Sequence, residues 1–211
     1  MIEKKFWKKQ RNIYWKMELK FEKGREKMNY YIADLHIGHK NILRLSNRPF
    51  KTMDQMIEKI IENWNKTVKA EDDVYILGDV FYRYDGNLKE LLQKLNGHKH
   101  LIIGNHEKQL LKNKQALYMF DSVDYYKEIT DTLNDKTVQI IMCHYPLAEW
   151  NGYFRNSIHL FGHIHNNTTN DTYKLMKKIK NAYNVGADIL NFTPQTLKNV
   201  IDLNNKFWKE H

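Results

Sequence analysis

The stretch VYILGDV, residues 74–80, runs four apolar residues directly into a glycine and an aspartate. A short apolar run bounded by turn residues predicts a buried β-strand, which places Asp79 just past its carboxyl end. Four other segments repeat the pattern: 30–33 before Asp34 and His36, 101–103 before Asn105 and His106, 138–143 before His144, and 158–161 before His163 and His165. Because the carboxyl ends of strands in an α/β sheet form the ligand site, we expect these side chains to converge.

The segments between these runs have helical periodicity. Apolar residues at spacings of three and four predict a helix over 53–68. Residues 87–95 and 194–203 predict two shorter helices, the second with Thr193 as its N-cap and Pro194 at its first helical position. Apolar runs that alternate with amphipathic helices indicate an α/β fold.

The composition limits the class of protein. A chain of 211 residues with 42% hydrophobic and 13% aromatic residues can form one domain with a core, which excludes an intrinsically disordered protein. No apolar run approaches the roughly 20 residues that cross a bilayer, so no membrane partner is expected. Cys143 is the only cysteine, which excludes an intrachain disulfide and a thiolate zinc cluster. These features favour a cytoplasmic location.

The net charge of +9 is concentrated at the N-terminus, because residues 1–27 alone carry +6. This segment is rich in both basic and aromatic residues, and we expect it to lie outside a single domain spanning 28–211. It is either a peripheral extension or an arm that grips nucleic acid. The remainder of the chain carries +3 and is mildly basic, which neither requires nor excludes a polyanionic partner.

The residues at the strand ends combine imidazole nitrogens with carboxylate and amide oxygens. Five of the ten histidines stand in such positions. This donor set suits Mn, Fe, Zn, Co or Ni better than Mg or Ca, and it is too large for one ion. Two ions about 3.5 to 4 Å apart stabilise in-line displacement at phosphorus, so phosphoester hydrolysis is the favoured chemistry.

The same motifs resemble those of the calcineurin-like metallophosphoesterases. The matching blocks are Asp34-Leu35-His36, Gly78-Asp79, Gly104-Asn105-His106-Glu107, His144 and Gly162-His163-Ile164-His165, in family order. The segments DLHIGHKNI and NVGADILNFTP further resemble small, cap-less bacterial and phage members. The resemblance implies two packed mixed β-sheets flanked by helices, a four-layer αββα sandwich.

The resemblance also implies roles for individual residues. Asp34, His36 and His165 would hold a first divalent transition-metal ion, Asn105, His144 and His163 a second, and Asp79 would bridge them. Manganese is the first choice, with Fe, Zn, Ni or Co as alternatives. His106 would assist the leaving group while a metal-bridging hydroxide attacks phosphorus.

Other assignments rest on position alone. His39, Arg48 and Arg83 lie near the motifs and could contact a substrate phosphate, whereas Asp188 fits a turn or capping residue better than a site residue. The expected substrate is a phosphodiester or a nucleotide. The alternatives are a non-catalytic metal-containing binding module and a nuclease that uses the basic N-terminal arm. The sequence does not determine the oligomeric state.

Overall fold

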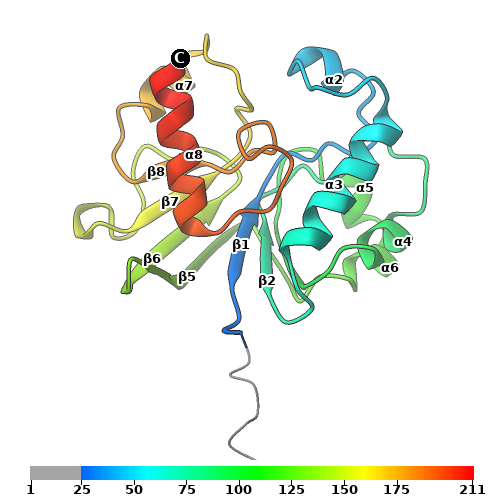
Figure 1. Ribbon diagram of the computed structural model, residues 1–211, viewed down its shortest axis with the longest axis horizontal. Coiled ribbons are helices and arrows are strands. Elements are labelled where there is room, and N and C mark those ends of the chain that lie inside the picture. Colours follow the sequence, from blue (N-terminus) through cyan, green and yellow to red (C-terminus); the bar gives the residue numbers. More distant parts are fainter. Residues whose placement is uncertain (1–24) are drawn as a thin grey trace, which may run out of the picture.

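The computed structural model describes residues 25–211, so the expectations for residues 1–24 of the N-terminal extension lie outside the described residues. Strands and helices alternate through most of this range (Figure 1). The strands are β1 Asn29–Ile32, β2 Asp73–Ile76, β3 His98–Ile102, β4 Ser122–Asp124, β5 Tyr126–Leu133, β6 Lys136–Cys143, β7 Ile158–Phe161 and β8 Ala182–Asn184. The helices are α2 Ile42–Leu45, α3 Met53–Thr67, α4 Leu88–Gln93, α5 Lys108–Leu111, α6 Lys114–Leu117, α7 Asp171–Met176 and α8 Leu197–Glu210, with one 3₁₀ turn at Tyr153–Arg155.

The strands form two four-stranded sheets, ordered β1-β2-β3-β4 and β5-β6-β7-β8. The first sheet is parallel throughout. In the second, β5 pairs antiparallel with β6 and the remaining pairs are parallel. The two-sheet α/β fold expected from the sequence is confirmed, and of the two sheets the second is mixed.

Three apolar layers hold these elements together. Side chains such as Tyr31, Leu77 and Met142 fill the space between the two sheets. The outer face of the first sheet packs against the helix side chains of Met56, Ile60 and Trp64, and the outer face of the second packs against α7. In Figure 1, α3 to α6 lie on one side of the strands and α7 and α8 on the other.

The helix predictions succeed where local periodicity decides the structure. Helix α3 spans Met53–Thr67, and the Thr52 side chain caps it by accepting from the Gln55 backbone N–H. Helix α4 lies within the predicted range 87–95 but spans only Leu88–Gln93, and Asn87 is its N-cap instead of its first residue. The prediction for the last helix is wrong at both ends, since α8 runs from Leu197 to Glu210. Its start is delayed because Gln195 exchanges two backbone hydrogen bonds with Tyr31 and is therefore extended.

The first described residues already contact the domain. Arg25 donates to Asp72 at 2.9 Å, and Lys27 pairs with Asp73 at 2.8 Å. None of the helices in the described range has the length and apolar character that crossing a membrane requires.

We predict that His159, on β7, makes the stability of the fold depend on pH. Its fully buried ring lies with Nδ1 3.1 Å from the Ile141 carbonyl and accepts from the Leu147 N–H at Nε2, and burial lowers its pKa to about 4. Stability from the neutral ring is complete above the ordinary pKa of 6.5. As the pH falls toward 4, the His159 imidazole becomes protonated in the unfolded chain but stays neutral in the folded chain. The free energy of unfolding therefore decreases by about 1.4 kcal/mol per pH unit.

Urea unfolding of wild type and of the His159→Gln variant, each at about pH 7 and pH 5, measures this effect. The wild type should lose more stability on acidification than the variant. Equal losses in the two proteins would show that another group is responsible.

Candidate metal centre

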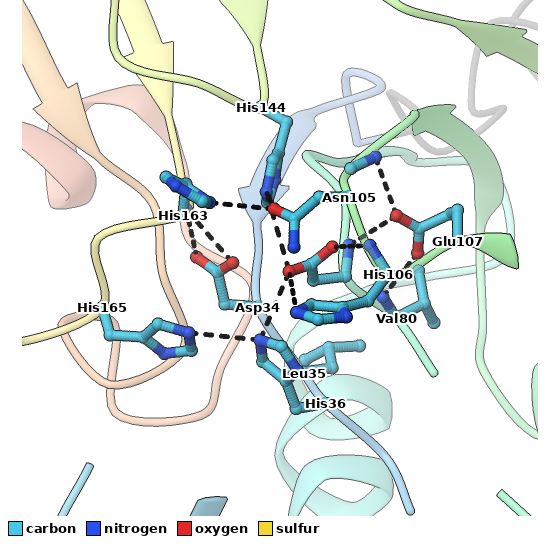
Figure 2. A network of polar contacts seen from close by, with 12 residues as sticks. Asp34, Leu35, His36, Val80, Asn105, His106, Glu107, His144, His163 and His165 are labelled. Atoms are coloured by element: carbon cyan, nitrogen blue, oxygen red, sulfur yellow. Dashed lines mark hydrogen bonds and ion pairs between the residues drawn. The ribbon is translucent and has the colours of Figure 1, made fainter. Parts of the chain in front are cut away.

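The five strand ends bring the expected side chains to one place, between the two sheets. Asp34 and His36 follow β1, Asp79 follows β2, Asn105 and His106 follow β3, His144 follows β6, and His163 and His165 follow β7. Figure 2 shows Asp34 between His163 and His165 from the second sheet and Asn105 and His106 from the first. The structure therefore brings these side chains together, as the sequence pattern predicts.

The distances between donor atoms are short throughout this cluster. His36 Nε2 lies 3.1 Å from His165 Nε2, and Asn105 Oδ1 lies 3.0 Å from His144 Nε2 and 2.9 Å from His163 Nδ1. Asp79 Oδ2 is 3.5 Å from His36 Nε2 and 3.7 Å from His144 Nε2. Two groups offer ligand atoms within 4.8 Å of one another, Asp34 with His36 and His165, and Asp34 with Asp79 and His144. Asp34 is common to these two groups, and Asp79 Oδ2 faces a histidine of each, so the cluster has the donors for two ions.

The backbone is bent to achieve this convergence. The φ angle is positive at Asp34, His36, Asp79, His163 and His165, with values between 51° and 71°. Such a conformation costs of order 1 kcal/mol or more for a non-glycine residue, and it persists where the surroundings enforce it. Gly78 is required for the same reason, since its φ is +86° and a Cβ there would lie 2.5 Å from His144 Nδ1.

The hydrogen bonds of two histidines fix which nitrogen faces the centre. His165 Nδ1 donates to Asp188 Oδ2 at 2.9 Å, and His144 Nδ1 donates to the Leu77 carbonyl at 2.7 Å. In a neutral ring, Nε2 is then an acceptor. His165 Nε2 faces His36, and His144 Nε2 faces the oxygens of Asn105 and Asp79. At His144, acceptor atoms thus face one another without a donor between them. A divalent cation bound there would be coordinated by these atoms.

Burial also shifts the pKa values of the cluster. Desolvation raises the pKa of Asp34 to about 6, and it lowers the pKa of His36 far below its ordinary value. The Nδ1 atom of His36 is buried and has no hydrogen-bond partner in the described part of the chain. A desolvated carboxylate beside several imidazoles is an environment in which a bound cation is stabilised, so the residues present fit a metal centre.

Glu107 ties two of the strand ends together, a role that the sequence analysis did not assign. Its carboxylate accepts from the backbone N–H groups of Gly104, Asp79 and Val80 at 2.7 to 2.8 Å (Figure 2). Burial raises its pKa to about 7. The residue stands in the block Gly104-Asn105-His106-Glu107, but nothing in that local pattern points to three partners, two of them on another loop.

Arg48 takes a structural position in place of the expected substrate contact. Its side chain is 0% exposed and pairs with Asp188 at 2.8 Å, and it also donates to the carbonyl oxygens of Leu35 and Asp34. Buried and fully engaged, this guanidinium is not presented to a substrate phosphate. Asp188 accordingly links Arg48 to His165 and does more than the expected turn or cap. Burial alone would raise the pKa of Asp188, but His165 and Arg48 lower it below its ordinary value.

Two clefts open beside the cluster, and His106 borders both. One, of about 740 Å³, contains His39 and is otherwise walled by neutral residues such as Asn166, Asn167 and Thr169. The other, of about 530 Å³, contains Arg83. Of the three residues expected near a substrate phosphate, His39 and Arg83 line clefts at the cluster and Arg48 does not.

Comparison with known proteins places the chain in a family. The family model for the calcineurin-like phosphoesterases matches residues 30–189, the range that carries every strand-end residue described above. This chain belongs to the calcineurin-like phosphoesterase family. The sequence resemblance to that family is thereby confirmed.

The relatives are small proteins. An uncharacterized protein of Methanocaldococcus jannaschii, MJ1445, is 31% identical over 179 residues, which cover 84% of this chain and 91% of that protein. The Gene 66 protein of Mycobacterium phage L5 is 30% identical over 93 residues, 41% of this chain and 43% of that protein. A crystal structure of AQ665, a protein of unknown function from Aquifex aeolicus, aligns with a TM-score of 0.64 and 26% identity over 84% of this chain and 100% of that one.

Proposed function

We propose that this calcineurin-like phosphoesterase uses two divalent transition-metal ions to hydrolyse a phosphodiester or a nucleotide. The observation that carries the proposal is the convergence of Asp34, Asp79 and four histidines, in which His144 Nε2 lies 3.0 Å from Asn105 Oδ1 and 3.7 Å from Asp79 Oδ2. Bound ions, with manganese as the first choice, would polarise the phosphoryl group and acidify a water molecule. The single cysteine of the chain supports a cytoplasmic location for this activity.

The side chains divide into two sets in this proposal. Asp34, His36 and His165 would hold one ion, Asn105, His144 and His163 would hold the other, and Asp79 would serve both. His106 is left without a ligand role, although its Nε2 lies 4.0 Å from Asp79 Oδ2 and its ring is 36% exposed beside both clefts. From this position an imidazole nitrogen of His106 donates a proton to the leaving oxygen of the phosphoester.

The test is an assay of purified protein with bis(p-nitrophenyl) phosphate and p-nitrophenyl phosphate in the presence of Mn, Ni, Zn or Mg. Metal content is measured by mass spectrometry on the same samples. Hydrolysis that depends on bound transition metal supports the proposal. Metal-loaded protein that leaves both esters intact argues for the non-catalytic binding module instead.

We predict that Asp188 positions His165 for the first ion. Asp188→Asn keeps an oxygen acceptor but removes the negative charge that orients the ring and pairs with Arg48. Loss of such a partner lowers metal affinity by about 10- to 100-fold. Competitive metal titration measures the change, and circular dichroism confirms that the variant is folded. Asp202→Asn, at an exposed aspartate of α8, is the matched control. An affinity equal in all three proteins would contradict the assignment.

A further inference from the structure

The cleft of about 530 Å³ beside the metal centre is basic. Its lining residues are Tyr82, Arg83, Asn105, His106, Lys108, Gln109 and Lys112, with three cations and no carboxylate among them. The larger cleft on the other side of His106 has no Lys, Arg, Asp or Glu in its wall. Of the two clefts that His106 borders, only the smaller one therefore has Lys or Arg side chains in its wall.

The acidic residue nearest in sequence to this wall does not neutralise it. The carboxylate of Glu107 is buried and turned inward, where it accepts from the backbone of Gly104, Asp79 and Val80. Arg83, Lys108 and Lys112 are all exposed. Their charge is available to an anion in the cleft.

The wall is held in place by side-chain contacts. Gln109 accepts from the Tyr84 N–H at 3.0 Å and donates to the Tyr84 carbonyl at 2.5 Å, which joins the loop carrying Arg83 to α5. The guanidinium of Arg83 lies 5.2 Å from the ring centre of Tyr82, and that ring packs edge-on against His106 at 4.8 Å. The fold thus fixes the cationic group next to the histidine at the centre.

We propose that Arg83, Lys108 and Lys112 form a subsite for a second phosphate group of the substrate, adjacent to the phosphate at the metal centre. This inference rests on the proposed phosphoesterase function and narrows its substrate class to compounds with neighbouring phosphates. The amide and hydroxyl groups of the neutral cleft suit the uncharged remainder of such a compound, because they can hydrogen-bond to sugar and base atoms. A nucleoside polyphosphate and a nucleic-acid strand both carry this chemistry.

The experiment compares kcat/KM for three substrates: bis(p-nitrophenyl) phosphate with one phosphate, ATP, and a short single-stranded DNA. The variant is the triple replacement Arg83→Ala, Lys108→Ala and Lys112→Ala. The matched control is Lys174→Ala, Lys198→Ala and Lys206→Ala, which removes the same charge from the exposed faces of α7 and α8. Loss of three exposed phosphate contacts should lower kcat/KM for ATP or DNA, relative to bis(p-nitrophenyl) phosphate, by about tenfold.

Calorimetry with inorganic tripolyphosphate gives a readout that does not need turnover. The triple variant should bind it about tenfold more weakly than wild type and the control, with a weaker dependence on salt. The quantity compared is kcat/KM for ATP or DNA divided by kcat/KM for bis(p-nitrophenyl) phosphate. If this ratio falls for ATP alone, the substrate is a polyphosphate; if it falls for DNA alone, the substrate is a nucleic-acid strand. Either result supports the subsite. Unchanged ratios and unchanged tripolyphosphate binding overturn it. Inactivity of wild type on all three substrates, with tripolyphosphate binding still lost in the triple variant, would overturn the proposed function and leave the subsite supported.

Discussion

Asp79→Asn should weaken metal binding and remove most of the phosphoesterase activity. The carboxylate of Asp79 is 2% exposed, and its Oδ2 lies within 4.0 Å of a nitrogen of His36, His106 and His144. Because it faces ligands of both proposed ions, removal of its charge weakens both. We expect bound metal to fall from two ions to one or none, and kcat/KM to fall by about a thousandfold or more, which corresponds to roughly 4 kcal/mol of lost transition-state stabilisation.

Metal content by mass spectrometry and hydrolysis of bis(p-nitrophenyl) phosphate measure the two effects on the same preparation. Asp121→Asn, an exposed aspartate after α6, controls for the loss of one carboxylate. If the Asp79→Asn variant kept two bound ions and half of the activity, Asp79 would not be a ligand of the centre and the bridging role would be wrong.

The local sequence pattern predicts the convergence of these side chains for a physical reason. Each candidate ligand comes directly after a short apolar run, and the carboxyl ends of strands meet at one edge of the sheet. Asp34 after β1 and His144 after β6 lie on different sheets, yet both sheets end at the same place. The rule needs only the nearest neighbours of each residue in the chain.

The support of the cluster could not be predicted in this way. Arg48 and Asp188 are 140 positions apart, and their ion pair depends on how α2 and the segment after β8 pack together. The three N–H groups that bind Glu107 belong to two separate loops. Because Arg and Asp side chains are mostly exposed in proteins, the sequence favours surface roles for both residues. Only the packed structure shows that these two are buried.

The sequence analysis also missed strands that depend on pairing with distant parts of the chain. β5 spans Tyr126–Leu133 with alternating exposed and half-buried residues, so it lacks the continuous apolar run of a central strand. β4 and β8 have three residues each and are extended because they pair with β3 and β7. The delayed start of α8 at Leu197 likewise follows from the pairing of Gln195 with distant Tyr31.

His106→Ala should separate catalysis from metal binding. The backbone N–H of His106 donates to Asp79 Oδ1 at 2.8 Å, and this bond survives replacement of the side chain. The imidazole itself borders both clefts and is outside the two groups of potential ligands. We therefore expect two bound ions, as in wild type, and a kcat reduced by about 10²- to 10⁴-fold, the usual contribution of a positioned general acid.

The dependence on the leaving group tells a proton donor from a residue that only shapes the cleft. A nitrophenolate leaves without protonation, whereas an alkoxide does not, so the loss in His106→Ala should be larger for an alkyl phosphoester than for bis(p-nitrophenyl) phosphate. His98→Ala, which removes an exposed histidine at the start of β3, is the control. Equal losses of activity on the two esters would show that His106 orients the substrate and does not donate a proton. Full activity of the variant would show that His106 has no role in the reaction.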